Sequence, residues 1–301
     1  MSLQVIIDGL IAGAMIGLGA IGVTLTYSIL RFANFAHGEF LAWGAYFALV
    51  VSGFLGALAP GLAAPIGPFS FGWSLPIAAI AAIALTAALA LLVDALLFGR
   101  LRAKGGAVII LVMASFGAAL TLRNFLEFIF TSRPAYYAEG LQIALKFGSL
   151  RATPDALLCL VVAVIVVVTV HLFISKTSIG RAMRAVSENP QLAGIVGVDS
   201  RNIVRLVWIL GAGLACLAGV MAGLLVQIRP TMGLDLLLPL FAAAILGGIG
   251  SAPGALLGGL IIGLAESFTV RLIGAEWRAA VAFVILVTIL LLRPSGLFGR
   301  S

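Results

Sequence analysis

Long apolar runs, separated by short clusters of glycine, proline or charged residues, occupy most of this 301-residue chain. A bilayer core of about 30 Å needs roughly 20 apolar residues per helix, whereas a membrane-barrel strand would alternate apolar and polar residues over about ten positions. The runs are continuously apolar, so they predict helices. Their positions are 3–30, 38–58, 74–98, 106–131, 154–175, 202–228, 253–272 and 276–293. A shorter run, 236–248, is predicted to be either a short crossing or a re-entrant half-helix.

Composition supports the same class of structure. Hydrophobic residues make up 62% of the chain, charged residues only 10%, and the mean hydropathy is +1.23, which leaves too little polar surface for a water-soluble domain. The sequence therefore predicts an all-α, polytopic transmembrane bundle of about 8 to 9 spans, with residues 1–301 as a single domain. The first run contains Asp8 and no Lys or Arg, so we expect a retained span rather than a cleaved signal peptide.

Positive charge gathers in two segments, 99–104 and 176–205. Because Lys and Arg accumulate in cytoplasmic loops, both segments are expected on the cytoplasmic side of the membrane. These two segments hold eight of the 18 cations, and the same topology puts the loop 133–153 outside. Arg31 also falls inside, and Arg293 and Arg300 join it if 236–272 crosses twice, which gives eleven cations inside. The net charge of +7 is therefore interpreted as a topology signal. Nucleic acid is not an expected partner, since no basic cluster is interleaved with aromatic residues.

The predicted cytoplasmic segment 176–201 has the pattern of two short amphipathic helices. Apolar residues recur at helical spacing on one face of the first helix, and Arg181, Arg184 and Glu188 occupy the opposite face. Asn189 followed by Pro190 is predicted to end this helix and begin the second, because Asn is a good N-cap and Pro is tolerated at the first helical position. The segment either lies on lipid headgroups or docks a cytoplasmic partner.

The second of these helices is short and carries its own apolar side. That side consists of Leu192, Ile195 and Val196. Gly197 suits the C-terminal end of the helix, because glycine adopts the left-handed backbone conformation at little cost.

A polar interruption, RFANFAHGEF, lies between the first two predicted spans. Backbone at membrane depth leaves the helical pattern only where protein or water satisfies its polar groups, so Asn34 to Gly38 is predicted to be a broken element lining a transport route. Asn34 and His37 would supply hydrogen bonds across the break, and Gly38 would allow a tight turn. The alternative is a short cytoplasmic loop in which Glu39 is a favourable anion in the first turn of the next helix.

A second interruption, LGGIGSAPGALLGGL, follows the short run near residue 246. Four glycines and a proline within nine residues cannot form the middle of a straight helix. The candidate residues of this second break are Gly247, Gly248, Gly250, Ser251 and Gly254. By the same reasoning as for the first break, we predict that they line the route.

Charges and small residues inside the runs mark further candidate contacts. Arg123 and Glu127 are four residues apart, so they are predicted to form an intramembrane ion pair on one helix face. Rows of small residues at i and i+4 predict close helix packing: Gly9, Gly13 and Gly17; Gly211, Ala215, Gly219 and Gly223; Gly259 and Gly263. Charges expected outside, where a substrate-binding protein would dock, are Arg133, Glu139, Lys146, Arg151, Arg229 and Asp235.

Three stretches, NFAHGEFLAWGAY, GRAMRAVSENPQLAGIVGV and AAAILGGIGSAPGALLGGLIIGL, together resemble the permease subunits of bacterial ABC importers of the branched-chain amino acid type. The chain is most similar to the shorter, LivH-type permease. The resemblance implies a multi-pass protein of the bacterial inner membrane, embedded in lipid, and a coupling helix that docks on an ATPase subunit. Carried over by position, the coupling surface is Arg181, Arg184, Glu188, Asn189, Ala193 and Gly197.

The same resemblance implies the other components of the importer. They are ABC ATPase subunits, a second permease of the LivM type or a second copy of this chain, and a periplasmic substrate-binding protein. No cofactor is expected in this chain, which lacks the G-x-x-x-x-G-K-[ST] phosphate loop, so ATP and Mg²⁺ would be bound by the ATPase. The chain is therefore expected to be a transport subunit and not an enzyme.

The solute stays open at this stage. Branched-chain or related amino acids are expected, but the first span reads GAMIGLGAIG and lacks the Ser and Tyr common in amino-acid members at Ala14 to Gly17. Relatives that carry urea, short amides or aromatic acids share the same three motifs. A stand-alone secondary transporter or channel is the distant alternative, and the scarcity of intramembrane acids argues against it. A membrane enzyme is disfavoured because His37 and His171 form no recognisable catalytic constellation with other residues.

Overall fold

The computed structural model describes residues 2–138, 142, 144–147, 150–293 and 295–298. These residues are almost entirely helical, which confirms the all-α prediction. The helices are α1 (Ser2–Leu30), α2 (His37–Leu58), α3 (Pro60–Ala63), α4 (Ser74–Val93), α5 (Gly99–Ala103), α6 (Val108–Phe130), α7 (Pro154–Lys176), α8 (Ser178–Glu188), α9 (Pro190–Ile195), α10 (Ser200–Leu225), α11 (Met232–Gly247), α12 (Ala252–Leu272) and α13 (Arg278–Leu292). Eight helical stretches of the described chain are long and apolar enough to cross a membrane, and they coincide with the eight predicted runs.

The described chain also contains a π-helix, a 3-10 turn and a pair of short strands. A π-helix, η1 (Asp94–Phe98), joins α4 to α5 without a break, so Ser74–Ala103 forms one long span. A 3-10 turn, η2 (Ala275–Trp277), precedes α13. Strands β1 (Leu145–Phe147) and β2 (Leu150–Ala152) pair antiparallel in the loop before α7, where the sequence pattern indicated no strand.

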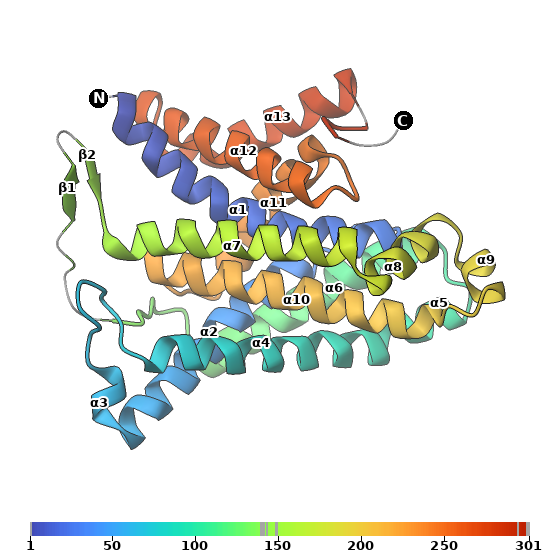
Figure 1. Ribbon diagram of the computed structural model, residues 1–301, viewed down its shortest axis with the longest axis horizontal. Coiled ribbons are helices and arrows are strands. Elements are labelled where there is room, and N and C mark those ends of the chain that lie inside the picture. The colour runs from blue at the N-terminus through green and yellow to red at the C-terminus, as the bar shows by residue number, and fades with distance from the viewer. Residues whose placement is uncertain (1, 139–141, 143, 148–149, 294, 299–301) are drawn as a thin grey trace.

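The long helices lie roughly along one axis, and the two ends of the bundle differ (Figure 1). One end carries α5, α8 and α9; we call it the coupling end. The opposite end carries α3 and the β1–β2 hairpin; we call it the loop end. The cationic segments 99–104 and 176–205 both lie at or near the coupling end, so the structure brings together the charges that the sequence analysis assigned to one side of the membrane.

Helix α1 lies in the centre of the bundle and packs most closely on α12. The predicted glycine rows form this contact: a Cβ added at Gly259 would lie 2.3 Å from Gly17 Cα, and one added at Gly263 would lie 2.3 Å from the backbone nitrogen of Gly13. Only hydrogen in place of a side chain permits such an approach. Membrane helices associate through this kind of backbone proximity, because lipid offers no hydrophobic drive between them.

Large aromatic side chains fill the bundle on the coupling side of α2. Trp208 of α10 stacks on Phe98 at a centroid distance of 5.4 Å and meets Phe40 edge-on at 6.1 Å. Phe32, in the segment before α2, packs on Phe98 at 5.2 Å. All four side chains are buried. They anchor the non-helical segment between α1 and α2 inside the protein, where its backbone is shielded from lipid.

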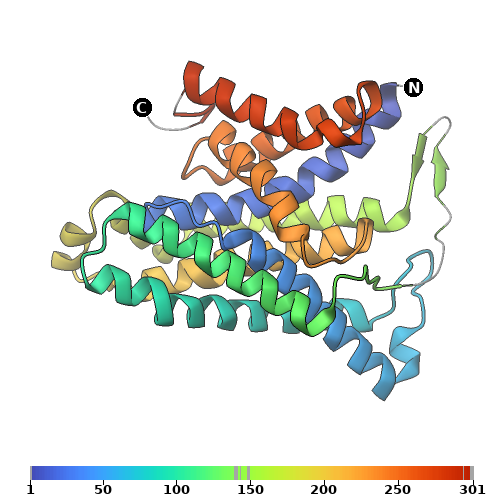
Figure 2. The ribbon, with the colours of Figure 1, turned by 180° about the vertical axis from the view of Figure 1, so that it is seen from behind.

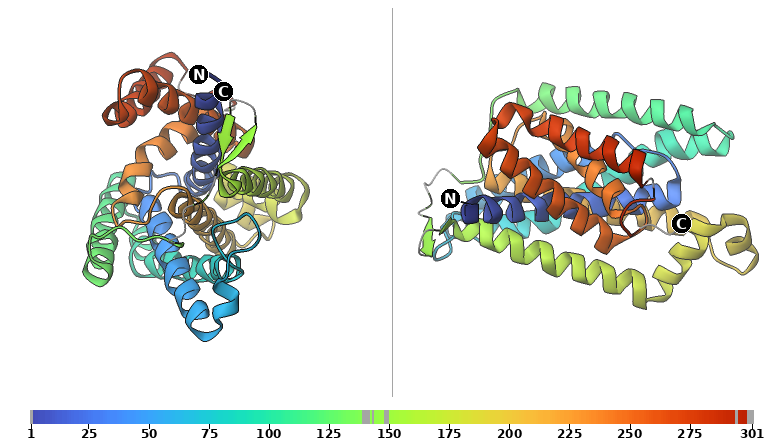
Figure 3. Two further views of the ribbon diagram at one scale, coloured as in Figure 1. Left: turned by 90° about the vertical axis from the view of Figure 1, so that its left-hand side faces the viewer. Right: turned by 90° about the horizontal axis from the view of Figure 1, so that it is seen from above.

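The short run 236–248 belongs to helix α11. The helix has 16 residues, about 24 Å, and begins at Met232, earlier than predicted. The prediction missed the first turn because Gly233 and Asp235 interrupt the apolar run there. Helix α11 lies between α6 on one side and α12 and α13 on the other. This is the face shown in Figure 2, and the left panel of Figure 3 shows the same helices from the end of the bundle.

Candidate functional site

The segment between α1 and α2 turns back into the bundle, so that α2 begins near the middle of the membrane. Three neighbours fix this depth. The backbone N–H of Phe35 donates to Ser115 Oγ of α6 at 3.1 Å. A Cβ added at Gly22 of α1 would lie 2.8 Å from the His37 ring and 2.9 Å from the carbonyl of Gly211 in α10. Each of these neighbours lies near the middle third of its own spanning helix.

The predicted break is therefore real, and Phe32, Asn34 and Ala36 of this segment are buried in the bundle. Glu39 lies in the first turn of α2, as the alternative interpretation expected. Asn34 Oδ1 accepts from the N–H of Ala36 at 3.1 Å, and the Asn34 carbonyl accepts from the N–H of His37 at 3.2 Å, which turns the chain into α2. Asn34 and His37 are buried. Within the described chain, Asn34 Nδ2 and His37 Nε2 have no hydrogen-bond partner.

Gly38 serves close packing and not the predicted tight turn. It lies in the first turn of α2 with an ordinary backbone conformation; the positive φ of this region belongs to Arg31, at +56°. A Cβ added at Gly38 would lie 2.4 Å from the carbonyl oxygen of Gly233, and one added at Gly233 would lie 2.3 Å from the carbonyl oxygen of Gly38. The N-termini of α2 and α11 therefore touch backbone to backbone.

The predicted pair of Arg123 with Glu127 is wrong. Arg123 of α6 instead reaches across to Glu39 of α2, with Nη2 at 2.7 Å and Nε at 3.2 Å from Oε1. The Glu39 side chain is 1% exposed and that of Arg123 15% exposed. Leaving the deeply buried Glu39 carboxylate without a cation would cost more free energy than leaving the half-buried Glu127 unpaired. Arg123 therefore pairs with Glu39 on another helix and not with its neighbour on the same helix.

A second ion pair lies beside the Gly38–Gly233 contact. Asp235, in the first turn of α11, pairs with Arg229 at 3.3 Å, and both side chains are about half exposed, at 48% and 46%. Both residues were expected to face outward; Asp235 lies in the first turn of α11, and Arg229 lies in the loop before that helix. Residues 226–231 pass from the end of α10 back toward the centre of the bundle, with Ile228 bridging Ala135 on the way, so the pair lies deeper than the sequence indicated.

The residues of the second predicted break form the turn between α11 and α12. Gly248 and Gly250 have positive φ angles, 95° and 90°, which require glycine. The N–H of Gly250 donates to Thr24 Oγ1 of α1 at 2.8 Å, and Ser251 Oγ caps α12 by accepting from the N–H of Gly254 at 3.1 Å.

A Cβ at Gly254 would lie 2.2 Å from the carbonyl oxygen of Gly247, so the backbones of α11 and α12 nearly touch at this turn. Thr24 is six residues, about 9 Å, short of the end of α1, which places the second break toward the coupling end. The two breaks are therefore separate, and the first meets the start of α11 instead of its end.

The coupling segment forms two helices at the predicted boundary. Thr177 caps α8 by accepting from the N–H of Gly180, and Asn189 caps α9 by accepting from the N–H groups of Gln191 and Leu192 at 3.0 and 3.1 Å. Gly197 has a positive φ of 87°, as predicted for the residue after the second helix.

Two members of the predicted coupling surface face inward. Ala193 is 3% exposed, and Arg184 is half-buried, donating to the carbonyl of Ile174 at the end of α7 at 2.5 Å. The sequence pattern predicted an apolar side for α9 without saying which way that side faces. The small Ala193 fits against the bundle, whereas the larger apolar residues point outward. Leu192, Ile195 and Val196 are 60%, 81% and 77% exposed.

Arg31 connects the first break directly to the coupling segment, which sequence reasoning missed. Its Nη2 donates to the carbonyls of Ser187 at 2.8 Å and Glu188 at 3.0 Å, the last residues of α8. A cation at a helix C-terminus is favoured by the partial negative charge there. The position of Arg31 at the start of the polar interruption was the available signal, but its partner is 156 residues away in sequence.

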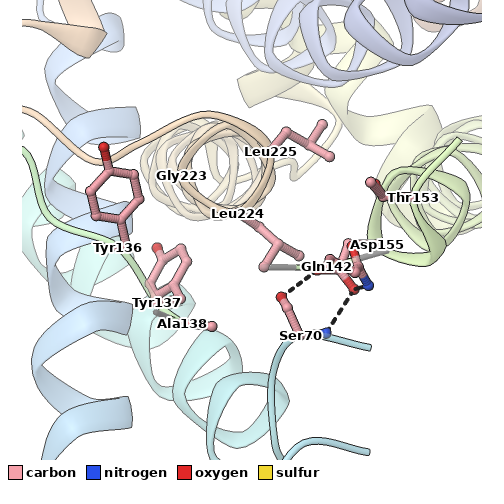
Figure 4. A pocket seen from close by; sticks show the side chains of 10 residues that line it. All are labelled: Ser70, Tyr136, Tyr137, Ala138, Gln142, Thr153, Asp155, Gly223, Leu224 and Leu225. Atoms are coloured by element: carbon pink, nitrogen blue, oxygen red, sulfur yellow. Dashed lines mark hydrogen bonds between the residues drawn. The ribbon is translucent and has the colours of Figure 1, made fainter. Parts of the chain in front are cut away.

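At the loop end, a cavity of about 240 Å³ lies between the start of α7, the end of α10 and the segment after α6 (Figure 4). Asp155 of α7 accepts hydrogen bonds there from the hydroxyl and backbone N–H of Ser70 and from Gln142. Tyr137 donates to the carbonyl of Ala45 at 2.9 Å, and burial raises the pKa of its hydroxyl well above the ordinary value.

Of the loop charges predicted to dock a substrate-binding protein, Arg133 and Arg151 are exposed. Glu139 and the side chain of Lys146 lie outside the described residues. The two exposed residues of this predicted set, Arg133 and Arg151, are therefore both cations.

These features define a polytopic helical membrane protein in which α2 and α11 begin inside the bundle, an architecture typical of transport proteins. The family model described as the permease component of the branched-chain amino acid transport system matches residues 5–290. The chain belongs to this family of permeases, multi-pass proteins of the inner membrane.

Named relatives agree with this assignment over nearly the full chain. It is 34% identical to the high-affinity branched-chain amino acid transport system permease protein BraD of Pseudomonas aeruginosa, covering 99% of this chain and 96% of BraD. It is 29% identical to the corresponding LivH protein of Escherichia coli, with the same coverage. A probable branched-chain amino acid transport permease protein LivH of Methanocaldococcus jannaschii is 27% identical, covering 98% of this chain and 92% of the relative.

Proposed function

We propose that this chain forms half of the membrane pathway of an ABC importer, energised by a separate ATPase that docks on α8 and α9. The observation that carries the proposal is the exposed apolar surface of Leu192, Ile195 and Val196, which belong to α9 and its C-cap. Helix α9 lies at the far tip of the coupling end (Figure 1). Exposed apolar residues this close together mark an interaction site. Family membership supports a protein partner over a lipid surface.

The proposal assigns direct partner contact to Arg181, Glu188, Asn189 and Gly197, which are exposed, together with the apolar side of α9. Arg184 and Ala193 instead hold the segment on the bundle. The coupling end faces the cytoplasm in this proposal, in agreement with its cations. ATP and Mg²⁺ are bound by the ATPase, and this chain contributes no ATP site.

The remaining partners follow from the proposed architecture. A second permease, of the LivM type or another copy of this chain, completes the pathway, and a periplasmic binding protein delivers solute to the loop end. The solute is a branched-chain or related amino acid, as the names of the BraD and LivH relatives suggest. Urea, short amides and aromatic acids are the alternatives, and competition with labelled leucine uptake separates them.

Co-purification with the ATPase tests the proposal. Ile195→Glu puts a charge on the proposed docking surface, where the side chain is 81% exposed and its replacement costs the fold little. We expect at least a tenfold loss of ATPase recovered with the tagged chain from native membranes. Ile273→Glu is the matched control, because Ile273 is also exposed, at 63%, but follows α12 at the opposite side of the membrane.

The control should retain the ATPase. Equal recovery of ATPase with both variants would show that α9 is not the docking surface. A wild-type chain that purified alone and moved leucine into liposomes without ATP would establish a secondary transporter instead.

A further inference from the structure

The exposed ion pair of Arg229 and Asp235 lies at a level of the bundle where contact with lipid would be costly. Gly233, two residues before Asp235, touches Gly38 at the start of α2, which lies near the middle of three spanning helices. Both charged side chains are nearly half exposed. Charges at the bilayer centre are costly and almost always face a bundle interior or a water-filled cavity. The face that carries α11 is therefore covered by water and protein in the working complex.

Other exposed polar residues of the spans show how a hydroxyl at a lipid-facing position normally forms its hydrogen bond. The hydroxyls of Thr121 and Thr169 donate to carbonyls in their own helices at 2.9 and 2.8 Å, which leaves no unmet donor. Arginine and aspartate side chains cannot be satisfied in this way. The contrast separates the α11 face from the opposite side of the bundle, where the exposed residues of α7 are mostly apolar.

Further charges surround the same point. Glu39 is paired with Arg123 through one carboxylate oxygen, and Glu127 lies one helical turn from Arg123 on α6. Asp235 follows two residues after Gly233, which touches Gly38 beside Glu39. The cluster thus holds three acids and two arginines, and the excess of one negative charge favours a ligand that brings an ammonium group. The partial positive charges of two helix N-termini, of α2 and α11, converge there as well.

An unmet polar group independently points to a ligand. Glu39 is 1% exposed, and its second carboxylate oxygen, Oε2, has no hydrogen-bond partner among the described residues. Leaving a buried carboxylate oxygen unpaired is expensive. Glu39 belongs to the first turn of α2, directly after Gly38, which touches Gly233 of α11; a donor that reached this oxygen would satisfy it.

We propose that the junction of α2 and α11 binds the charged end of an amino-acid zwitterion as it passes through the pathway. Asp235 and Glu39 receive the ammonium group, while Arg229 and the N-terminal backbone of α11 receive the carboxylate. This inference rests on the proposed function, because it places the pathway along the face shown in Figure 2, between this chain and the second permease. The side chain of the solute then needs only an apolar surface, which the neighbouring phenylalanines supply: Phe35, Phe116 and Phe241 lie together, with centroid distances of 6.3 and 5.7 Å from Phe35.

Water access at this depth gives the first test. Asp235→Cys is expressed in the complete importer and treated with a positively charged methanethiosulfonate reagent, which reacts only with hydrated thiolates. Ile165→Cys is the matched control, because Ile165 is 58% exposed at the middle of α7. The native Cys159 and Cys216 are buried and give the background rate. We expect Asp235→Cys to react at least tenfold faster than Ile165→Cys, and equal rates would overturn the proposal.

Should Asp235→Cys fail to assemble, Leu234→Cys carries the same measurement. Leu234 is its exposed neighbour, at 46%, and its replacement leaves the ion pair intact.

Protection by ligand gives the second test. Leucine, which carries both charges, should slow labelling of Leu234→Cys at least threefold in the importer supplied with binding protein and ATP. Isovaleric acid, which lacks the ammonium group, and isopentylamine, which lacks the carboxylate, should not. Equal protection by all three, or by none, would refute a zwitterion site. ATP-driven leucine uptake by the wild type, measured in the same vesicles, separates this failure from a failure of the proposed function.

Discussion

Replacing Gly259 by alanine should weaken the packing of α1 on α12 by an amount that the structure allows us to work out. The new Cβ would lie 2.3 Å from Gly17 Cα and 2.4 Å from its backbone nitrogen, whereas ordinary van der Waals contact begins at 3.4 Å. The two helices must therefore separate by about 1.1 Å, since backbone cannot rotate away as a side chain can. Overpacking of this kind costs about 1–3 kcal/mol.

A glycine elsewhere in the bundle isolates this cost from helix propensity. Alanine gains about 0.8–1 kcal/mol over glycine in a helix interior, wherever it is placed. Gly117→Ala in α6 makes the same change at a position where a Cβ meets nothing within 4 Å. We expect Gly259→Ala to be less stable than Gly117→Ala by about 1–3 kcal/mol, measured by unfolding in mixed detergent micelles with tryptophan fluorescence. Equal stabilities of the two variants would refute the close contact of α1 with α12.

Three further predictions concern the ion pair, the α8 connection and the loop end. Arg123→Gln should destabilise the fold by about 3–5 kcal/mol by stranding the Glu39 carboxylate, and Glu39→Gln in the same chain should restore much of the loss in a double-mutant cycle. Arg31→Ala should reduce uptake per ATP hydrolysed while ATPase recovery is unchanged, whereas Arg31→Lys, which keeps the cation near the end of α8, should retain most of the coupling. Tyr137→Phe should cost about 0.5–1.5 kcal/mol. Because burial raises the pKa of Tyr137, its protonated form stabilises the wild type fully below pH 10, and this part of the stability should decline at higher pH in the wild type only.

Span positions and helix caps could be predicted from sequence because both depend on local chemistry. Continuous apolar runs gave the eight spans, and Asn189 with Pro190 gave the boundary between α8 and α9. The orientation of side chains could not be predicted in the same way. Arg123 pairs with Glu39 on another helix, and Ala193 displaces the larger apolar residues of α9 from the bundle. Both outcomes depend on which helices are neighbours, and a single sequence does not contain that information in its periodicity.

The candidate site shows the same division between local and non-local information. The break at Asn34 to Gly38 was recognisable, because polar residues and glycine interrupt an apolar stretch. Its partner in space was not, since the segment before α11 looked like an outer loop. The return of residues 226–231 into the bundle depends on contacts with the segment after α6, through the Ile228–Ala135 bridge.

The backbone contact between Gly38 and Gly233 limits how α2 and α11 can move. Helix α2 runs from this contact toward the loop end, and α11 runs from it toward the coupling end. With no side chain between them, neither helix can slide along the membrane normal without colliding with the carbonyl of the other. Tilting about the contact is the motion that this geometry leaves free. The contact then serves as a fulcrum in the middle of the membrane, and a displacement that opens one half of the bundle is geometrically tied to the other half.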